Sequence, residues 1–202
     1  MFAQVIQGKV SDATAARAAL ERWVSTLSAD ASEWLGSTAG VTDDGTLIMV
    51  ARFGSAEAAQ RNSDRPEQGD WWAETAKLFD GEPTFDNSTE VDVDVAADPD
   101  ASEFVQIMRG QMSDPARARE LMQQDPEVWQ NFRPDILGTV TAVHEGGRYT
   151  SVIYFNSESE AREGESKEVP AELQSAMEEM GSVYVGETEY LDLKDPWLHS
   201  PS

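Results

Sequence analysis

Two glutamines lie among apolar residues in segments expected to form strands. Gln4 follows Phe2 and precedes Ile6, and Gln106 lies between Phe104 and Met108 in the same way. Residues two apart share a face of a strand, so each glutamine should lie on an apolar face. A polar side chain in such a place must find a hydrogen-bond partner or open onto a cavity. Two interpretations stand for both glutamines: a hydrogen bond inside the protein, or contact with a bound molecule.

The common catalytic and metal-binding residue sets are missing from the sequence. The chain has no cysteine and two histidines, His144 beside a Glu-Gly-Gly turn and His199 in the C-terminal tail. Neither histidine is placed like a buried general base. The carboxylates are dispersed, and no nucleophile elbow, phosphate loop or dinucleotide glycine motif occurs. We therefore expect no metal and no cofactor.

The charge balance excludes several classes of partner. The 202 residues include 15 Lys and Arg against 38 Asp and Glu, a net charge of −23. Such a surface repels nucleic-acid phosphates and anionic lipid. No apolar run reaches the roughly 20 residues of a membrane span, and the first residues do not read as a secretory signal. We expect a cytoplasmic protein that binds neither nucleic acid nor membrane.

An internal repeat organises the chain. Residues 2–60 align without a gap with residues 104–162, at an offset of 102, with 15 identities in 59 positions. The identities fall on caps, turns and apolar positions, as in Gly8 and Gly110 or Ser55 and Ser157. After Gln60 the offset becomes 100. The pattern indicates a tandem duplication.

Each copy predicts the same series of elements. An apolar-rich strand leads to a capped helix, then to a hairpin with an Asp-Gly or Gly-Gly turn, a second Ser-capped helix and a last strand. In the second copy, Asp125-Pro126 should interrupt the first helix. The expected strands span residues 2–10, 35–42, 46–53 and 84–93 in the first copy, and 104–112, 137–144, 148–155 and 183–193 in the second.

The order strand-helix-strand-strand-helix-strand is the ferredoxin-like α+β unit. We therefore predict an α+β protein with two tandem ferredoxin-like repeats, residues 1–95 and 102–194, joined by an acidic linker at 96–101. Such a unit covers one face of its sheet with helices and leaves the other bare. The two bare faces should close into a pseudo-dimeric α+β barrel. The monomer would then be complete, and higher oligomers are not required.

The chain resembles the dimeric α+β barrel superfamily, especially its antibiotic-biosynthesis-monooxygenase-like branch. The resemblance rests on the element order in both copies and on the stretches 50–59, 62–66 and 69–72. It implies that an Asn and a Trp near the second helix bind an aromatic substrate and stabilise its deprotonated form. Asn62 and either Trp71 or Trp72 match these positions. Haem-degrading members use a His on that helix, which both copies lack, so haem degradation is not expected.

The resemblance thus suggests catalytic roles for Asn62 and Trp72, with Trp71, Arg52 and Gln4 contacting the substrate. Each of these residues also has a purely structural interpretation. The tryptophans could pack the core, Asn62 could satisfy backbone groups at a helix end, and Arg52 could form an ion pair. The second copy replaces residues 62–72 by the unlike segment 164–170, so a pocket is expected in the first copy, with the second as a scaffold.

Three functions remain open from the sequence. The first is a cofactor-independent monooxygenase acting on a small aromatic or quinol-type molecule. The second is a non-catalytic barrel that binds a small hydrophobic or aromatic molecule. The third is a structural or partner-binding barrel with a filled core. The absence of an acid-base pair favours the last two, and the resemblance favours the first.

Overall fold

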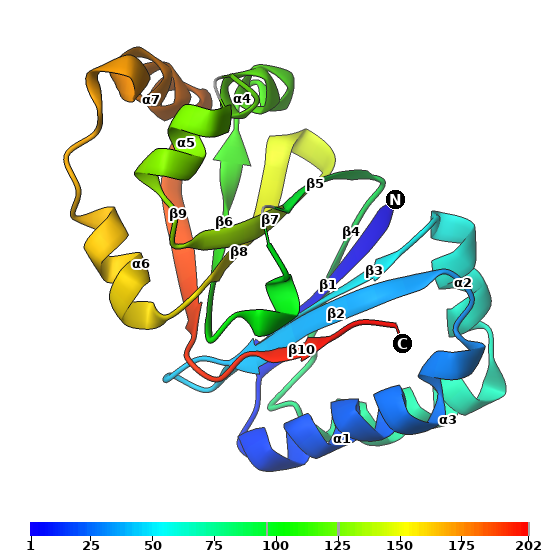
Figure 1. The fold of residues 1–202 in the computed structure, drawn as a ribbon. Coiled ribbons are helices and arrows are strands. Elements are labelled where there is room, and N and C mark those ends of the chain that lie inside the picture. The colour runs from blue at the N-terminus through cyan, green and yellow to red at the C-terminus, as the bar shows by residue number, and fades with distance from the viewer. Residues whose placement is uncertain (96, 125, 202) are drawn as a thin grey trace. The chain divides into compact units, whose positions relative to one another are not determined.

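The computed structural model describes residues 1–95, 97–124 and 126–201, which form two compact units (Figure 1). Unit 1 contains residues 1–91 together with 195–201. Unit 2 contains residues 92–194. Each unit has one five-stranded antiparallel sheet with helices packed on it, so the predicted pair of α+β repeats is confirmed. The closing of a barrel by the two sheets stays a prediction.

The sheet of unit 1 has the strand order β10-β2-β3-β1-β4. Its four main strands have the ferredoxin-like order, and the hairpin between β2 and β3 turns at Gly45, whose φ of 80° suits glycine. The turn therefore sets the register in which Val41 pairs with Leu47. The strands are β1 (Phe2–Lys9), β2 (Trp34–Val41), β3 (Thr46–Phe53), β4 (Thr84–Ser88) and β10 (Trp197–His199).

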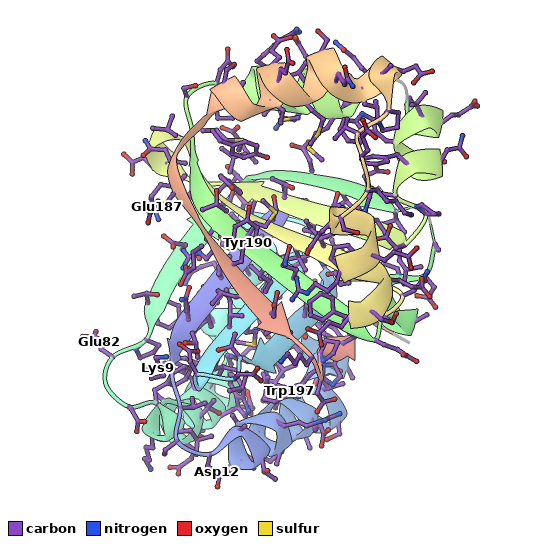
Figure 2. All side chains as sticks on the ribbon, turned by 90° about the vertical axis from the view of Figure 1, so that its left-hand side faces the viewer. Lys9, Asp12, Glu82, Glu187, Tyr190 and Trp197 are labelled. Carbon is purple, nitrogen blue, oxygen red and sulfur yellow. The ribbon has the colours of Figure 1, made fainter. Side chains whose placement is uncertain are left out.

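The helices of unit 1 begin where the sequence places caps. The Asp12 side chain accepts a hydrogen bond from Ala15 N at the start of α1 (Ala13–Thr26), and Ser55 caps α2 (Ala56–Ser63) through Ala58 N. Pro66, in the first turn, begins a further helix, α3 (Pro66–Thr75). Figure 2 labels Asp12 at the start of α1 and Trp197 on β10.

Unit 2 repeats this plan with the strand order β5-β7-β8-β6-β9. Asp114 and Ser157 cap its helices as Asp12 and Ser55 do in unit 1. The first helix is interrupted before Pro126, as predicted, although Asp125 itself lies outside the described residues. The strands are β5 (Glu90–Val95), β6 (Phe104–Met112), β7 (Ile136–Val143), β8 (Arg148–Phe155) and β9 (Tyr184–Leu193), and the helices are α4 (Pro115–Met122), α5 (Pro126–Phe132), α6 (Glu158–Glu165) and α7 (Ala171–Val183).

The chain crosses between the two sheets at two places that the sequence did not indicate. The single strand expected at 84–93 is two strands, β4 in the first sheet and β5 in the second. Between them, the Ser88 hydroxyl bonds to both Glu90 N and Glu90 O at 3.0 Å, a local turn that competes with strand pairing. His199, expected in a tail, lies in β10 beside β2. Ala96, in the expected linker, lies outside the described residues.

Buried apolar residues form clusters in both units. In unit 1 they form one cluster from Phe2 through Trp23 and Trp71 to Trp197. In the described part of unit 2, one cluster lies around Tyr149 and another around Phe104 and Phe155. Among the described residues, none of the helices combines the length and the apolar composition that a membrane span requires.

Candidate functional site

A cavity of about 220 Å³ lies in unit 1 between the sheet and its helices. Strands supply Gln4, Ile6 and Met49 to its lining, and helices supply Trp23 and Asn62. Within the part of the chain that the structure describes, no Asp, Glu, Lys, Arg or His lines it. In a chain of net charge −23, this is an uncharged, mainly apolar chamber. Such a chamber suits a small, largely apolar ligand.

A connected series of aromatic rings forms one wall of the cavity. Trp23 packs edge-on against Trp34 with the ring centroids 5.1 Å apart, and lies 6.4 Å from Trp71. Trp72 follows at 6.0 Å from Trp71 and meets Phe85 at 5.3 Å. All five rings line the cavity. Phe85 is 48% exposed, so this wall reaches the surface.

The neighbouring tryptophans Trp71 and Trp72 are held differently. Trp71 is buried, and its Nε1 donates to Ala19 O on α1 at 2.9 Å. Trp72 is half-buried, and nothing in the described chain accepts a hydrogen bond from its Nε1. Trp71 thus joins α3 to α1 while also lining the cavity. Trp72 lines the cavity without being held by a hydrogen bond to the described chain.

Asn62 has a fixed orientation in the cavity lining. It is 6% exposed, and its Oδ1 accepts a hydrogen bond from Arg65 Nη1 at 3.1 Å. Arg65 is held in turn by Leu27 O, also at 3.1 Å. Because the carbonyl end of the amide is taken by a guanidinium, Nδ2 carries the free donors, and no described residue accepts from it. Nδ2 itself is not fully buried, so a ligand oxygen or a water molecule in the cavity can accept from it.

Gln68 is a second oriented amide that the sequence analysis missed. Its Oε1 accepts a hydrogen bond from Trp23 Nε1 at 2.6 Å, so its Nε2 donors are also left free of described acceptors. It lines the cavity on α3. The signal was its spacing, since Gln68 precedes Trp71 and Trp72 by three and four residues and so shares their helix face.

Gln4 fits both of the interpretations that the sequence left open. Its Nε2 donates to Asn87 Oδ1 on β4 at 3.2 Å, and its side chain lines the cavity. Gln106, its repeat in unit 2, donates to Asp192 Oδ1 at 3.0 Å. The two glutamines therefore hold the same strand pair together in both units, and only Gln4 borders this cavity.

The structure does not bring Arg52 to the cavity. Met49, Ala51 and Phe53 of β3 line it, and alternation along the strand turns Arg52 to the opposite face of the sheet. The guanidinium Nη2 lies 3.4 Å from Leu35 O on β2. Asn62, Trp71, Trp72 and Gln4 are thus brought together, and Arg52 is not.

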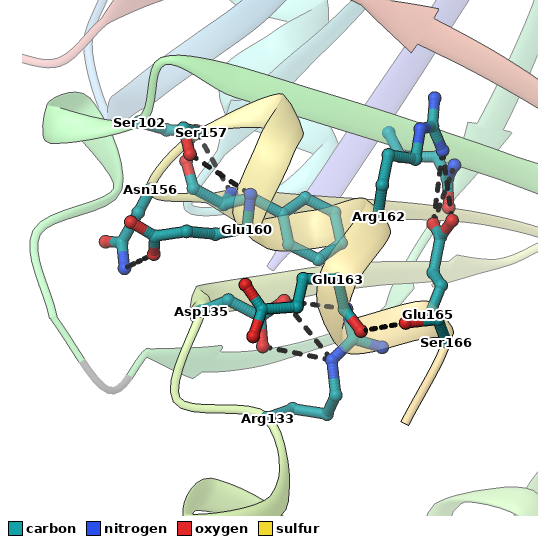
Figure 3. Close-up of polar contacts among 12 residues, drawn as sticks. Ser102, Arg133, Asp135, Asn156, Ser157, Glu160, Arg162, Glu163, Glu165 and Ser166 are labelled. Atoms are coloured by element: carbon teal, nitrogen blue, oxygen red, sulfur yellow. Dashed lines mark hydrogen bonds and ion pairs between the residues drawn. The ribbon is translucent and has the colours of Figure 1, made fainter. Parts of the chain in front are cut away.

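In unit 2, an ion pair fills the place that corresponds to Asn62 (Figure 3). Gly164 takes the Asn62 position, and a Cβ there would lie 2.5 Å from Arg133 Nε. The Arg133 Nη2 and Asp135 Oδ2 atoms are 2.7 Å apart, and the Asp135 side chain is only 5% exposed. The Arg133 guanidinium lies over the Phe155 ring at 5.6 Å. Unit 2 therefore cannot hold an oriented amide at this position.

Residues that could bind a metal ion are not grouped in the described part of the chain. No cluster of three or more His, Cys, Asp or Glu side chains occurs among the residues described. His144 is buried and its Nε2 lies 3.0 Å from Thr150 Oγ1. The side chains on which chemistry at the unit 1 cavity could depend are therefore uncharged: amides, indoles and the hydroxyls of Ser37 and Ser63.

Comparisons with known proteins identify the fold. No protein-family model and no curated protein matches the sequence. Solved structures of two proteins named "putative monooxygenase" match over 98% of this chain, one from Fusobacterium nucleatum (TM-score 0.71, 13% identity, 94% of that chain) and one from Lactobacillus acidophilus (0.68, 10%, 99%). An anthrone oxidase-like protein matches over 98% of this chain and 92% of its own (0.66, 13%). At these identities the likeness shows the fold alone, and at that level the resemblance to monooxygenase-like α+β proteins is confirmed.

Proposed function

We propose that the unit 1 cavity binds a small flat phenol, hydroquinone or anthrone and oxygenates it with dioxygen, without a cofactor. Asn62 carries this proposal, because it is an amide in the cavity lining whose carbonyl is held by Arg65 and whose N–H groups have no described acceptor. Such donors stabilise a phenolate or enolate oxygen more than the neutral group from which it forms. The structural neighbours named as monooxygenases or anthrone oxidase-like support this class of chemistry.

In this proposal the residues bind and orient the substrate. The ring lies against Trp72, with Trp71 as the wall behind, and the ring oxygen accepts from Asn62 Nδ2. Gln68 Nε2 and Gln4 border the same space and would contact further oxygens. Arg52, on the other face of the sheet, has no part in this cavity.

The proposed reaction balances without any other reagent. An anthrone methylene loses two hydrogens and gains one oxygen atom from dioxygen, and the second oxygen atom leaves as water. Because no ionisable side chain of the described residues lines the cavity, the first proton passes to solvent, and the oxyanion is held by neutral donors. The substrate must therefore be acidic enough to ionise once its oxygen is hydrogen-bonded.

The test is oxygen uptake with 1,8-dihydroxyanthrone, followed together with quinone absorbance. We expect turnover by the wild type and at least a hundredfold lower kcat/KM in Asn62→Ala, since removing one oxyanion donor typically costs roughly 10²–10³. Asn156→Ala is the matched control, because Asn156 is an amide on unit 2 that bonds to Glu160. Equal loss in both variants, or full activity in Asn62→Ala, would contradict the role of Asn62.

Binding without turnover is the second candidate function, and the uncharged lining favours it. The same ligand would then raise the melting temperature and quench tryptophan fluorescence, with no oxygen consumed. Asn62→Ala would weaken this binding, while Asn156→Ala would not. The cavity of about 220 Å³ in unit 1 favours these two functions over a filled structural core.

A further inference from the structure

Unit 2 contains a cavity of its own, of about 320 Å³, between its sheet and the helices α4 and α5. Strands supply Asp92, Thr141, Ser151 and Tyr184 to its lining. Helix α4 supplies Arg119 and Met122. The counterparts of Gln4, Phe53 and Asn62 do not border it. Its lining overlaps that of the unit 1 cavity only in part, since Met122, Thr139 and Ser151 are the counterparts of Leu20, Ser37 and Met49. The sequence predicts unit 2 as a scaffold, and this cavity departs from that prediction.

Strands β10 and β5 occupy equivalent places in the two units. β10 lies beside β2, and β5 beside β7, which is the repeat of β2. A Cβ on Gly36 of β2 would lie 2.7 Å from His199 O, and one on Gly138 of β7 would lie 2.9 Å from Asp94 O. Gly36 and Gly138 are at equivalent positions in the two repeats. His199 beside Gly36 and Asp94 beside Gly138 therefore occupy equivalent positions on β10 and β5. Two residues earlier, Trp197 corresponds to Asp92.

In unit 1, the Trp197 ring lies beneath the guanidinium group of Arg17. Trp197 is 5% exposed, and the Arg17 guanidinium carbon lies 5.9 Å from its ring centroid (Figure 2 labels Trp197). In unit 2, Arg119 repeats Arg17, and its Nε bonds to Asp92 Oδ2 at 2.7 Å. No described residue accepts from the Arg119 Nη atoms. The arginine is thus kept while the ring is absent.

The sheet beneath this place has also changed from apolar to polar. Ala39, which pairs with Trp197 in unit 1, is replaced in unit 2 by Thr141, and Met49 by Ser151. The Thr141 and Ser151 hydroxyls lie 2.8 Å apart. Polar groups in a pocket fix the orientation of a ligand that carries matching groups.

Tyr184 adds a hydroxyl group at another side of the cavity. Burial raises the pKa of its phenol to about 12, with smaller contributions from Tyr149 and Tyr190, so it is protonated at physiological pH. No described residue bonds to its hydroxyl group. Thioether and ring atoms of Met112, Met122 and Pro126 supply the apolar part of the lining.

We propose that unit 2 binds, in this cavity, a planar aromatic molecule about the size of an indole that carries hydroxyl or amine groups. Its ring takes the place against Arg119 that Trp197 takes against Arg17, which is a cation–π contact. Its polar groups bond to Thr141, Ser151 and the Tyr184 hydroxyl. Asp92 and Asp94 border the site with one arginine, so neutral or cationic ligands are favoured over anions.

The test uses 5-hydroxyindole and amide NMR spectra of the whole chain. We expect saturable shifts at Thr141, Ser151 and Tyr184, which persist in Asn62→Ala because unit 1 has a separate cavity. Indole-2-carboxylate should bind at least fivefold more weakly. Shifts confined to unit 1 residues, no saturable shift at all, or tighter binding of the carboxylate would overturn the proposal.

Two variants replace residues of the unit 2 cavity by their unit 1 counterparts and should abolish ligand binding there. Asp92→Trp supplies the missing ring, and the double change Thr141→Ala with Ser151→Met restores the apolar floor without depending on the ring. Each should weaken 5-hydroxyindole binding at least tenfold while circular dichroism shows a folded chain. Unchanged affinity in a folded variant would show that the ligand binds elsewhere and would overturn the assignment.

Discussion

Beside Asn62 in unit 1, the space between sheet and helices is hollow, uncharged and walled by indoles. Beside Gly164 in unit 2, the corresponding space contains the Arg133–Asp135 ion pair over the Phe155 ring. The strands and caps around the two places repeat closely. The same backbone plan therefore supports either an open chamber or a packed polar network, and a few side chains decide between them.

The two solutions exclude each other for a steric reason. Arg133 and Asp135 replace Ala31 and Glu33 of unit 1, where Ala31 is buried and Glu33 pairs outward with Arg61. With the guanidinium turned inward, no Cβ fits at residue 164. An asparagine at this position thus requires a small residue at the place of Arg133.

Breaking the ion pair of unit 2 should have the largest effect on stability. Asp135→Ala leaves Arg133 mostly buried without its partner, so we expect a loss of about 3 kcal/mol in the free energy of unfolding. Glu74→Gln, which breaks the exposed pair of Glu74 with Lys77, is the control and should cost less than about 1 kcal/mol. Urea denaturation measures both. Similar values for the two variants would mean that the ion pair is not what fills unit 2.

Adding one methyl group at Gly164 tests the steric argument directly. Gly164→Ala places a Cβ against Arg133 and Asp135 and should destabilise by about 2 kcal/mol. Gly181→Ala, on α7 with nothing within 4 Å of its Cβ, should stabilise by up to about 1 kcal/mol. Thermal denaturation of the two variants should therefore give shifts of opposite sign. A neutral Gly164→Ala would show that the ion pair can move aside.

Substituting Trp71 and Trp72 one at a time should distinguish a residue that stabilises the fold from one that binds the ligand. Trp71→Phe loses the hydrogen bond to Ala19 O and should cost about 1.5 kcal/mol in unfolding free energy. Trp72→Phe loses no hydrogen bond to the described chain and should cost about 0.5 kcal/mol, but should weaken binding of an aromatic ligand more. Urea denaturation and ligand titration of the same variants test this. Greater destabilisation by Trp72→Phe would reverse the assignment.

Tyr184 should show the smallest effect at neutral pH and a measurable one in alkali. Its pKa is raised by burial from 10.0 to about 12, so its folded form holds a proton that the unfolded chain releases. The stability it contributes is complete below about pH 10 and is lost as the pH rises toward 12. All four tyrosines lie in unit 2, so absorbance at alkaline pH reports on that unit alone. Burial also raises the pKa of Tyr149, so Tyr184→Phe should reduce the late-titrating absorbance without abolishing it, and should make the loss of stability with pH less steep.

Much of the fold could be read from local sequence. Asp12, Asp114, Ser55 and Ser157 mark helix starts because a side-chain oxygen must satisfy free N–H groups there, wherever the helix lies. Gly45 marks a hairpin for a similarly local reason. The sequence could not show that β5 joins the sheet of unit 2 and β10 the sheet of unit 1. The residue pattern of each segment suits a strand in either sheet, and only the pairing of β5 with β7 and of β10 with β2 decides between the sheets.

The candidate site was predictable only in part. The resemblance indicated Asn62, Trp71 and Trp72, and strand alternation placed Gln4 on the face that lines the cavity. Arg52 does not line the cavity, because alternation along β3 turns it to the face opposite Ala51 and Phe53. Gln68 was missed although its spacing puts it on the helix face of Trp71 and Trp72, because only the hydrogen bond from Trp23 shows how its amide is oriented.

By itself, the sequence determined the duplication, the order of elements and the apolar faces, because caps, turns and periodicity act over a few residues. The tertiary structure alone decided that Asn62 keeps free donors, that Arg133 fills the corresponding place, and that Trp197 has no counterpart ring in unit 2. Each of these depends on side chains 3 to 180 residues apart in the chain, such as Asn62 with Arg65 and Arg17 with Trp197. Hydrogen bonds and steric exclusion act through space, and no pattern along the chain records which groups will meet.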